Sequence, residues 1–166
     1  MKKNGAVFAV YTAAIAAIYV VLCMLSSLLG LSSGIIQLRL SEILCLLPIF
    51  TPAAVPGLAL GCLISNILSG GVPLDIVFGT AATLLGALGT AFLRKCSPFI
   101  AMFPPILANA IIVPLVLRFG YLVTSPLWFT AATVAAGEII MCYGGCFALY
   151  APLKRNKRIF EVGYND

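Results

Sequence analysis

Apolar residues follow one another along this chain in long runs, separated by short polar or proline-rich breaks. The runs predict six membrane-spanning helices, at about residues 5–25, 37–50, 54–69, 74–94, 99–119 and 126–152. A helix of roughly 20 residues crosses the hydrocarbon core of a bilayer. Six such helices take up most of the 166 residues and leave only short connections. The pattern predicts an all-α integral membrane protein, a six-transmembrane-helix bundle that forms a single membrane domain over residues 1–166.

The second run is the exception, because prolines interrupt it early. Pro48 comes about 12 residues after Ile36, and at 1.5 Å per residue this segment covers about 18 Å. It cannot cross a core of about 30 Å without a tilt or a break. Residues 51–57 contain two more prolines and predict a sharp turn. The preceding loop, residues 26–36, is predicted either to close over a pocket or to lie in the headgroup region.

Composition supports the membrane assignment, and the position of the basic residues predicts orientation. Hydrophobic residues make up 62% of the chain and the mean hydropathy is +1.13, more than a soluble domain needs. The first run lacks a small-residue processing site, so we expect it to be retained. The net charge of +5 comes from basic clusters at Lys2, Lys3, Arg94, Lys95, Lys154, Arg155, Lys157 and Arg158. With six spans these clusters share one side, which predicts that both termini are cytoplasmic, and the charge then indicates lipid rather than nucleic acid.

Several polar side chains lie inside or at the ends of the apolar runs. A charge near the bilayer centre costs about 2.5–3.5 kcal/mol on insertion scales, so it needs a partner or a ligand. Glu138 is the strongest candidate, because it lies about 15 Å into the last run. The predicted substrate-binding residues are Glu138, Glu42, Arg39, Asn109, Asn66 and Asp75.

Structural explanations compete with each of these assignments. The whole set can form an internal ion network with Arg118, in which Arg39 and Glu42 pair at i,i+3. Asp75 can serve only as a helix cap. Asn109 can hydrogen-bond to a neighbouring helix. A polar cavity that opens to the outside explains the same residues and also the excess of acidic groups.

The sequence offers few groups for catalysis or metal binding. Six cysteines are scattered over different runs and there is no histidine, so we predict no metal site and no cofactor. The chain contains no Walker A loop, GxSxG elbow or HExxH motif, so we predict no catalytic residues and no hydrolysis of ATP by this chain. No inverted repeat relates the two halves, which weakens the hypothesis of a secondary transporter.

Small residues mark one face of the first run. Ala9, Ala13 and Ala17 repeat at i, i+4 and i+8, so this face lets another helix approach closely. The pattern alone favours packing within the bundle and docking on a partner about equally.

The polar and proline-rich segments together resemble a known family. QLRLSEILCLLP, TPAAVPGLALGCLISN, GGVPLDIVFGTAATLLGAL, NAIIVPLVL and the GE of the last run are similar to the queuosine-precursor transporter (QueT) family, over nearly the whole chain. The resemblance implies a substrate-binding S component of an energy-coupling factor (ECF) transporter in a prokaryotic plasma membrane. Such a protein captures a 7-deazaguanine-type base outside and associates with a transmembrane coupling subunit and two cytosolic ATPases. It also implies partner docking through Ala9, Ala13 and Ala17.

The residue chemistry is compatible with such a base. A guanine-like edge presents adjacent N–H and NH₂ donors, which a carboxylate such as Glu138 or Glu42 can accept together. Asn109 or Asn66 can read the carbonyl and a ring nitrogen. An aromatic ring can stack on the flat base, with Phe78, Trp128 and Tyr143 as candidates. The alternatives are a self-contained secondary permease for a small heteroaromatic metabolite, an S component for another vitamin-like ligand, and an intramembrane enzyme or assembly factor.

Overall fold

The structure is a computed structural model that describes residues 2–31 and 36–156, and all its regular elements are helical. In chain order they are α1 (Lys2–Leu28), η1 (Leu40–Ile49), α2 (Ala54–Leu68), η2 (Asp75–Gly79), α3 (Thr80–Phe92), α4 (Pro98–Ala101), α5 (Phe103–Phe119) and α6 (Leu127–Arg155). The short η1 is a 3₁₀-helix, and η2 is a π-helical turn that continues directly into α3. The predicted all-α class is confirmed.

Four segments of the described chain are long and apolar enough to cross a membrane. They are Gly5–Leu28, Asp75–Phe92, Pro98–Phe119 and Leu127–Arg155. The apolar helices η1 and α2 are shorter, and the shortness of η1 agrees with the prediction from Pro48. Six apolar segments are therefore present, but two of them lack the length of a regular transmembrane helix.

The short η1 lies in the middle of the bundle, and other helices pack against it on several sides. It packs against α6, α1 and α3. Leu44 of η1 belongs to a core with Ile15 and Leu58, whereas Leu46 belongs to a second core with Met102. The short helix therefore links the two hydrophobic cores of the bundle.

Glycines bring α6 unusually close to the segment that contains η1. A Cβ atom at Gly145 would lie 2.7 Å from Cγ2 of Ile43, and one at Gly137 would overlap the carbonyl oxygen of Gln37. No larger residue fits at either position without a shift of the neighbouring backbone. These contacts fix the segment from Gln37 onward against the wall that α6 provides.

The helix α1 uses one face to pack on α2 and leaves another face free. Ile15, Ala16 and Tyr19 are buried, and Gly61 of α2 lies directly under Tyr19. Ala9, Ala13 and Ala17 are exposed, so these three alanines do not serve the packing of α1 within the bundle.

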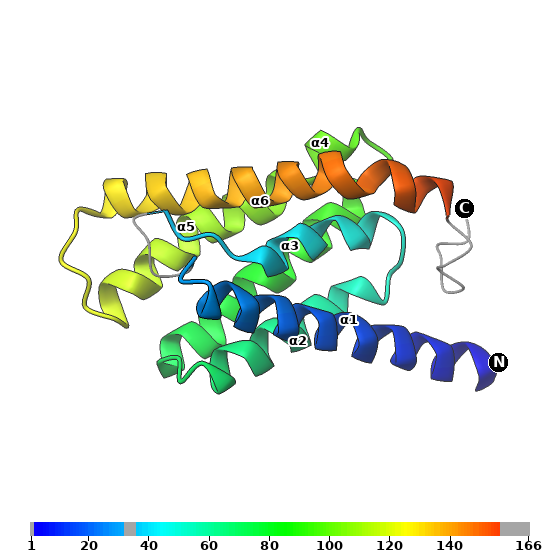
Figure 1. Cartoon of the computed structure of the whole chain (residues 1–166), viewed down its shortest axis with the longest axis horizontal. Coiled ribbons are helices and arrows are strands. Elements are labelled where there is room, and N and C mark those ends of the chain that lie inside the picture. Colours follow the sequence, from blue (N-terminus) through cyan, green and yellow to red (C-terminus); the bar gives the residue numbers. More distant parts are fainter. Residues whose placement is uncertain (1, 32–35, 157–166) are drawn as a thin grey trace.

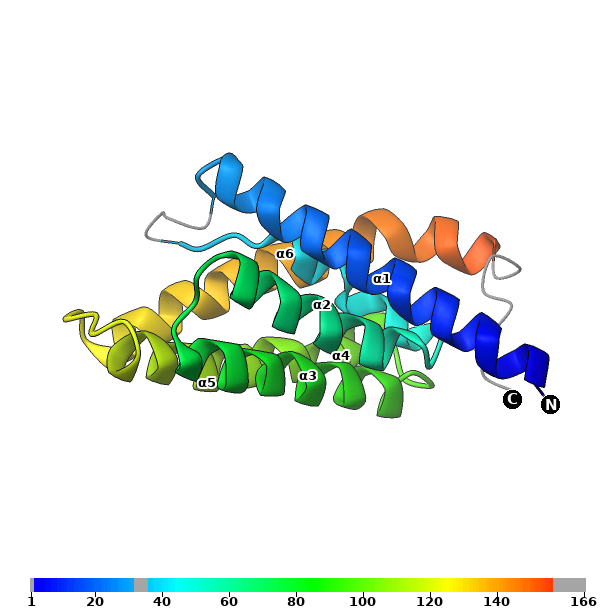
Figure 2. The same ribbon diagram turned by 90° about the horizontal axis from the view of Figure 1, so that it is seen from below.

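The start of α1 and the end of α6 lie at the same end of the bundle (Figure 1), and the turn between α3 and α4 points toward that end in both views (Figures 1 and 2). We call this the terminal end and the opposite one the distal end. Residues 36–39, 69–74 and 120–126 lie at the distal end. The basic residues Lys157 and Arg158, and residues 32–35 of the predicted lid, lie outside the described residues.

Candidate functional site

Three adjoining cavities lined by described residues open at the distal end, and we refer to them together as the distal vestibule. Arg39, Asp75 and Tyr121 line both of the first two cavities. The first has a volume of about 150 Å³ and is completed by Cys23, Ser26, Ser27, Asn66, Ser69 and Gly71. The second has a volume of about 290 Å³ and is completed by Gln37, Val113, Val116, Leu117 and Val123.

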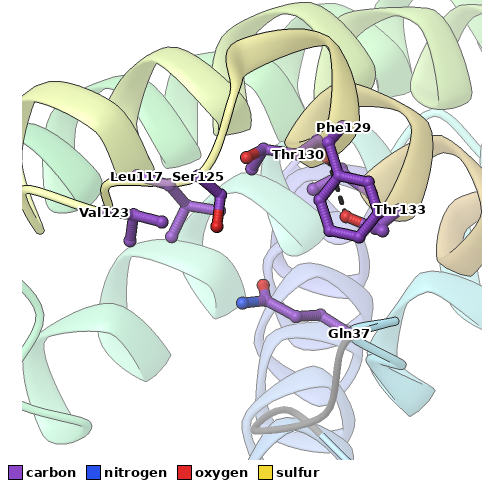
Figure 3. A pocket seen from close by; sticks show the side chains of 8 residues that line it. Gln37, Leu117, Val123, Ser125, Phe129, Thr130 and Thr133 are labelled. Carbon is purple, nitrogen blue, oxygen red and sulfur yellow. Dashed lines mark hydrogen bonds between the residues drawn. The ribbon is translucent and has the colours of Figure 1, made fainter.

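The third cavity continues the vestibule toward α6. It has a volume of about 210 Å³ and shares Gln37, Leu117 and Val123 with the second cavity. Figure 3 shows the side chain of Gln37 on the opposite side of this cavity from Ser125 and Thr130. The hydroxyl group of Thr133 donates to the carbonyl oxygen of Thr130, a contact that fixes its position at the start of α6 (Figure 3).

Asp75 is held between α2 and the loop that follows α5. The hydroxyl group of Tyr121 donates to Oδ2 of Asp75 over 2.8 Å, and Nδ2 of Asn66 donates to the backbone oxygen of Asp75 over 3.0 Å. A Cβ atom at Gly79 would lie 2.8 Å from Oδ1 of Asp75. The glycine thus leaves room for the carboxyl group where the π turn meets α3. The carboxyl group accepts from Tyr121, whereas the predicted alternative was a helix cap.

The environment keeps the Tyr121 hydroxyl group in its donor form. Burial, the hydrogen bond to Asp75 and the charge of that carboxyl group raise the pKa of Tyr121. Tyr121 follows the end of α5 and is still 42% exposed, so it lies at the mouth of the vestibule rather than in the core. At neutral pH it therefore donates to Asp75.

Arg39 lies at the junction of the first two cavities in an extended backbone segment, with φ −105° and ψ 108°. Within the described residues, no hydrogen bond or ion pair occupies its guanidinium group. The predicted Arg39–Glu42 pair is absent, because the helical geometry begins only after Arg39 and i,i+3 spacing aligns side chains only on a helix. Arg39 remains within electrostatic range of Asp75 and Glu42.

A second polar group, the inner carboxyl cluster, consists of Glu42, Glu138 and their buried neighbours. Oε1 of Glu42 accepts from the Tyr19 hydroxyl group over 3.0 Å, and Oε2 accepts from the Cys45 thiol over 3.1 Å. Sγ of Cys142 lies 3.7 Å from Oε2 of Glu138 and 3.8 Å from the carbonyl oxygen of Glu42. The two acids are therefore neighbours across the contact between η1 and α6.

The structure places the six predicted binding residues in these two groups. Arg39, Asn66 and Asp75 line the distal vestibule, whereas Glu42 and Glu138 belong to the inner cluster. Asn109 joins the inner cluster, because its side chain interacts with the Glu138 carboxyl group. The backbone N–H of Glu42 donates to the carbonyl oxygen of Arg39 over 3.0 Å, so the two groups adjoin along the chain at the start of η1.

Arg118 has a partner outside the distal vestibule and the inner carboxyl cluster. Arg118, which we expected to share in an ion network, donates from Nη1 to the carbonyl oxygen of Val123 and so stabilises the loop before α6. In the part of the chain that the structure describes, no three potential metal ligands converge on one point.

The aromatic side chains considered for stacking lie elsewhere. Phe78 lines an apolar groove of about 440 Å³ together with residues of α5. Trp128 is 73% exposed, and the ring of Tyr143 packs at 5.8 Å from that of Phe99. Sequence reasoning missed Gln37 and Tyr121 as lining residues. Their only signal was position, since Gln37 precedes Arg39 by two residues and Tyr121 follows the end of the fifth run.

Comparison with known proteins identifies the family. A family model described as the QueT transporter matches residues 9–155, which is most of the chain. The chain belongs to the QueT transporter family. The queuosine precursor transporter QueT of Lactococcus lactis subsp. cremoris (strain MG1363) is 32% identical to this chain, and the match covers 90% of this chain and 94% of the relative. No solved structure matches.

Membership in the QueT family confirms the resemblance seen in the sequence and sets the location of the protein. A transporter family and four apolar helices of spanning length show a multi-pass protein of the cell membrane. The distal vestibule and the inner carboxyl cluster are then polar groups of a membrane transporter, where an uncompensated polar group is unfavourable.

Proposed function

We propose that this QueT-family chain is the substrate-binding membrane subunit of an ECF-type importer, and that it captures a 7-deazaguanine-type queuosine precursor at the distal end. The relative from Lactococcus lactis carries the name of a queuosine precursor transporter, which supports the substrate. The observation that carries the proposal is that the distal vestibule and the inner carboxyl cluster are next to each other at the distal end of η1. Arg39 lines the vestibule and Glu42 of the inner cluster is three residues further on, so the two polar groups adjoin at the start of η1.

The inner carboxyl cluster suits the donor-rich edge of the base. A carboxylate of Glu138 or Glu42 accepts the adjacent N–H and NH₂ groups, and Asn109 beside Glu138 supplies both a donor and an acceptor. The edge that carries the ring carbonyl then faces the vestibule, where Arg39 offers only donors. In this arrangement the planar base lies between the carboxyl groups of the inner cluster and the guanidinium group of Arg39.

The proposed topology has six crossings with both termini cytoplasmic. The common end of α1 and α6 supports an even number of crossings (Figures 1 and 2). The basic residues Arg94, Lys95, Lys154 and Arg155 follow α3 or end α6, in agreement with a cytoplasmic terminal end. The distal vestibule then opens to the outside.

Energy for release comes from partner subunits in this proposal. The sequence contains no phosphate-binding loop of the type that ATPases use. The exposed alanines Ala9, Ala13 and Ala17 form a flat surface on α1, which suits close contact with a helix of the transmembrane coupling subunit. Two cytosolic ATPases complete the importer.

Two measurements test the proposed function. Purified chain in detergent is titrated calorimetrically with 7-deazaguanine and its 7-aminomethyl and 7-cyano derivatives, with adenine as the control base. Saturable binding of the 7-deazaguanines, with little binding of adenine, is expected. Liposomes with the chain alone, and with coupling subunit and ATPases added, are then assayed for uptake. Uptake by the lone chain on a proton or sodium gradient would establish the permease alternative instead.

A further inference from the structure

The hydrogen bond between Tyr121 and Asp75 stands where two cavities of the distal vestibule meet. Both residues line the 150 Å³ cavity and the 290 Å³ cavity, and so does Arg39. A cavity of roughly 150 Å³ holds a molecule the size of benzene. A bicyclic base with a substituent needs more room than the smaller cavity provides. A base that enters the smaller cavity therefore extends into the 290 Å³ cavity past Tyr121 and Asp75, which line both cavities.

The groups at this junction have opposite and complementary hydrogen-bonding roles. Arg39 carries only donors, and none of the described residues accepts a hydrogen bond from its guanidinium group. The carboxyl group of Asp75 accepts, and its Oδ2 already has a donor in Tyr121 at 2.8 Å. A ligand that separates Tyr121 from Asp75 leaves a 7% exposed carboxyl group short of a donor unless the ligand supplies one.

The backbone on both sides of this hydrogen bond departs from regular geometry. Leu122, next to Tyr121, has a φ of 55°, which is uncommon for a residue with a side chain. Asp75 begins the π turn of η2, and such turns occur frequently at functional sites. Strained residues of this kind persist where the surrounding structure holds them, and they gather at ligand clamps.

We propose that the ligand exchanges places with the Tyr121 hydroxyl group: a donor on the ligand's ring substituent replaces it at Asp75, while the ring carbonyl accepts from Arg39. This inference rests on the proposed function and deepens it. It assigns the discrimination among planar bases to these residues, so that bases with an N–H donor, such as a primary amine, on the edge beside the carbonyl are favoured over bases without one. Asp75 becomes the residue that selects for that donor, and Tyr121 becomes the group that holds the empty site closed.

The exchange has a distinctive consequence for Tyr121→Phe. The phenylalanine keeps the ring but removes the hydroxyl group that competes with the ligand for Asp75. Binding of 7-aminomethyl-7-deazaguanine should therefore become tighter by about 2- to 10-fold, the range that corresponds to one net hydrogen bond. A structural role for the hydroxyl group predicts the opposite sign. Tyr143→Phe is the matched control, because its ring packs on Phe99 away from the vestibule.

The variant Asp75→Asn provides a second test of the exchange. The amide exchanges a charged acceptor for a weaker one, so affinity for the 7-aminomethyl base should fall by about 10- to 100-fold. Affinity for the 7-cyano base, which has no donor on that substituent, should change less than threefold. The ratio of the two losses, rather than either loss alone, reports on the donor at Asp75.

The experiment is a calorimetric titration of both bases against the full chain and the three variants in detergent, with thermal melts of each sample. Tighter binding in Tyr121→Phe and a selective loss in Asp75→Asn support the exchange. Weaker or unchanged binding in Tyr121→Phe would overturn it, and so would equal losses for both bases in Asp75→Asn. If the wild-type chain binds neither base, the proposed function is refuted. The behaviour of the variants tests only the exchange at Asp75.

Discussion

The Tyr19 hydroxyl group donates to Oε1 of Glu42 across 3.0 Å, and this bond joins α1 to η1 in the interior of the bundle. Tyr19 is 1% exposed and Glu42 is 2% exposed, so neither group has access to bulk water. The carboxyl group of Glu42 therefore depends on its protein donors.

Tyr19→Phe should destabilise the protein by about 1–3 kcal/mol, because it leaves a buried carboxyl oxygen without its donor. The measurement is the thermal unfolding midpoint in detergent. Tyr11→Phe on the same helix is the control for the loss of a hydroxyl group from a less buried site. Equal midpoints for Tyr19→Phe and wild type would show that another donor reaches Glu42.

Gly61→Ala should lower stability, because the added Cβ atom would lie 2.6 Å from Cβ of Tyr19 and 3.0 Å from the carbonyl oxygen of Ala16. Overpacking of this kind costs about 1–3 kcal/mol. Gly144→Ala is the matched control in α6, since nothing lies within 4 Å of its added Cβ atom. The control should be neutral or stabilise by up to about 1 kcal/mol. Both midpoints come from the same melting experiment, and a reversed order would contradict the contact between α1 and α2.

Ala13→Trp should prevent association with the coupling subunit while it leaves folding and ligand binding intact. Ala13 is exposed on α1, so a bulky side chain meets nothing within the chain. Ala16→Trp is the matched control three residues further on, where a 6% exposed alanine packs inside. The control should lose stability instead. Co-purification and ligand titration separate the two effects, and loss of ligand binding in Ala13→Trp with normal co-purification would assign this face to the site.

Glu138→Gln should weaken binding of the 7-deazaguanine bases by about one to two decades. The amide keeps the shape of the side chain but replaces a charged acceptor, which contributes roughly 1.5–3 kcal/mol. The check is calorimetric titration, with thermal melts as the folding control. Unchanged affinity together with a lower midpoint would show that Glu138, with Asn109 and Cys142, serves only the structure.

The hydrogen bond from Tyr121 should stabilise the protein only while the phenol is protonated. Its folded-state pKa is raised, so the stabilisation is complete below the unfolded value of about 10 and is lost as pH rises through the folded value. The difference in midpoint between wild type and Tyr121→Phe should hold from pH 6 to 9 and shrink at higher pH. The charged groups near the phenol are Asp75 and Arg39. A difference that persists unchanged at pH 11 would contradict this account.

The helical pattern of the chain was predictable, because it depends on local hydrophobicity and on prolines. The shortness of η1 followed from Pro48, and the burial of Glu138 followed from its position within the last run. The absence of an Arg39–Glu42 pair could not be foreseen, since the spacing of the two residues suits a helix. The extended backbone at Arg39 removes that geometry.

The residues that line the distal vestibule were harder to predict from the sequence than the buried acids Glu42 and Glu138. Asp75 and Tyr121 are 46 positions apart, and the contact between them depends on how α5 ends and how η2 begins. A π turn has no clear sequence signature, and a loop residue such as Gln37 carries no periodic signal. Contacts of this kind arise from the tertiary arrangement.

The length of η1 has a consequence for where water can reach within the membrane. A 3₁₀-helix rises about 2.0 Å per residue, so its ten residues cover about 20 Å of a hydrocarbon core of about 30 Å. Residues 36–39 supply the rest of the path as extended chain, whose amide groups lack helical partners. Such backbone is tolerated at membrane depth only beside protein or a hydrated space. In the proposed six-crossing topology, the shortness of η1 places the extended backbone of residues 36–39 at the distal end of this crossing, where Gln37 and Arg39 line the vestibule.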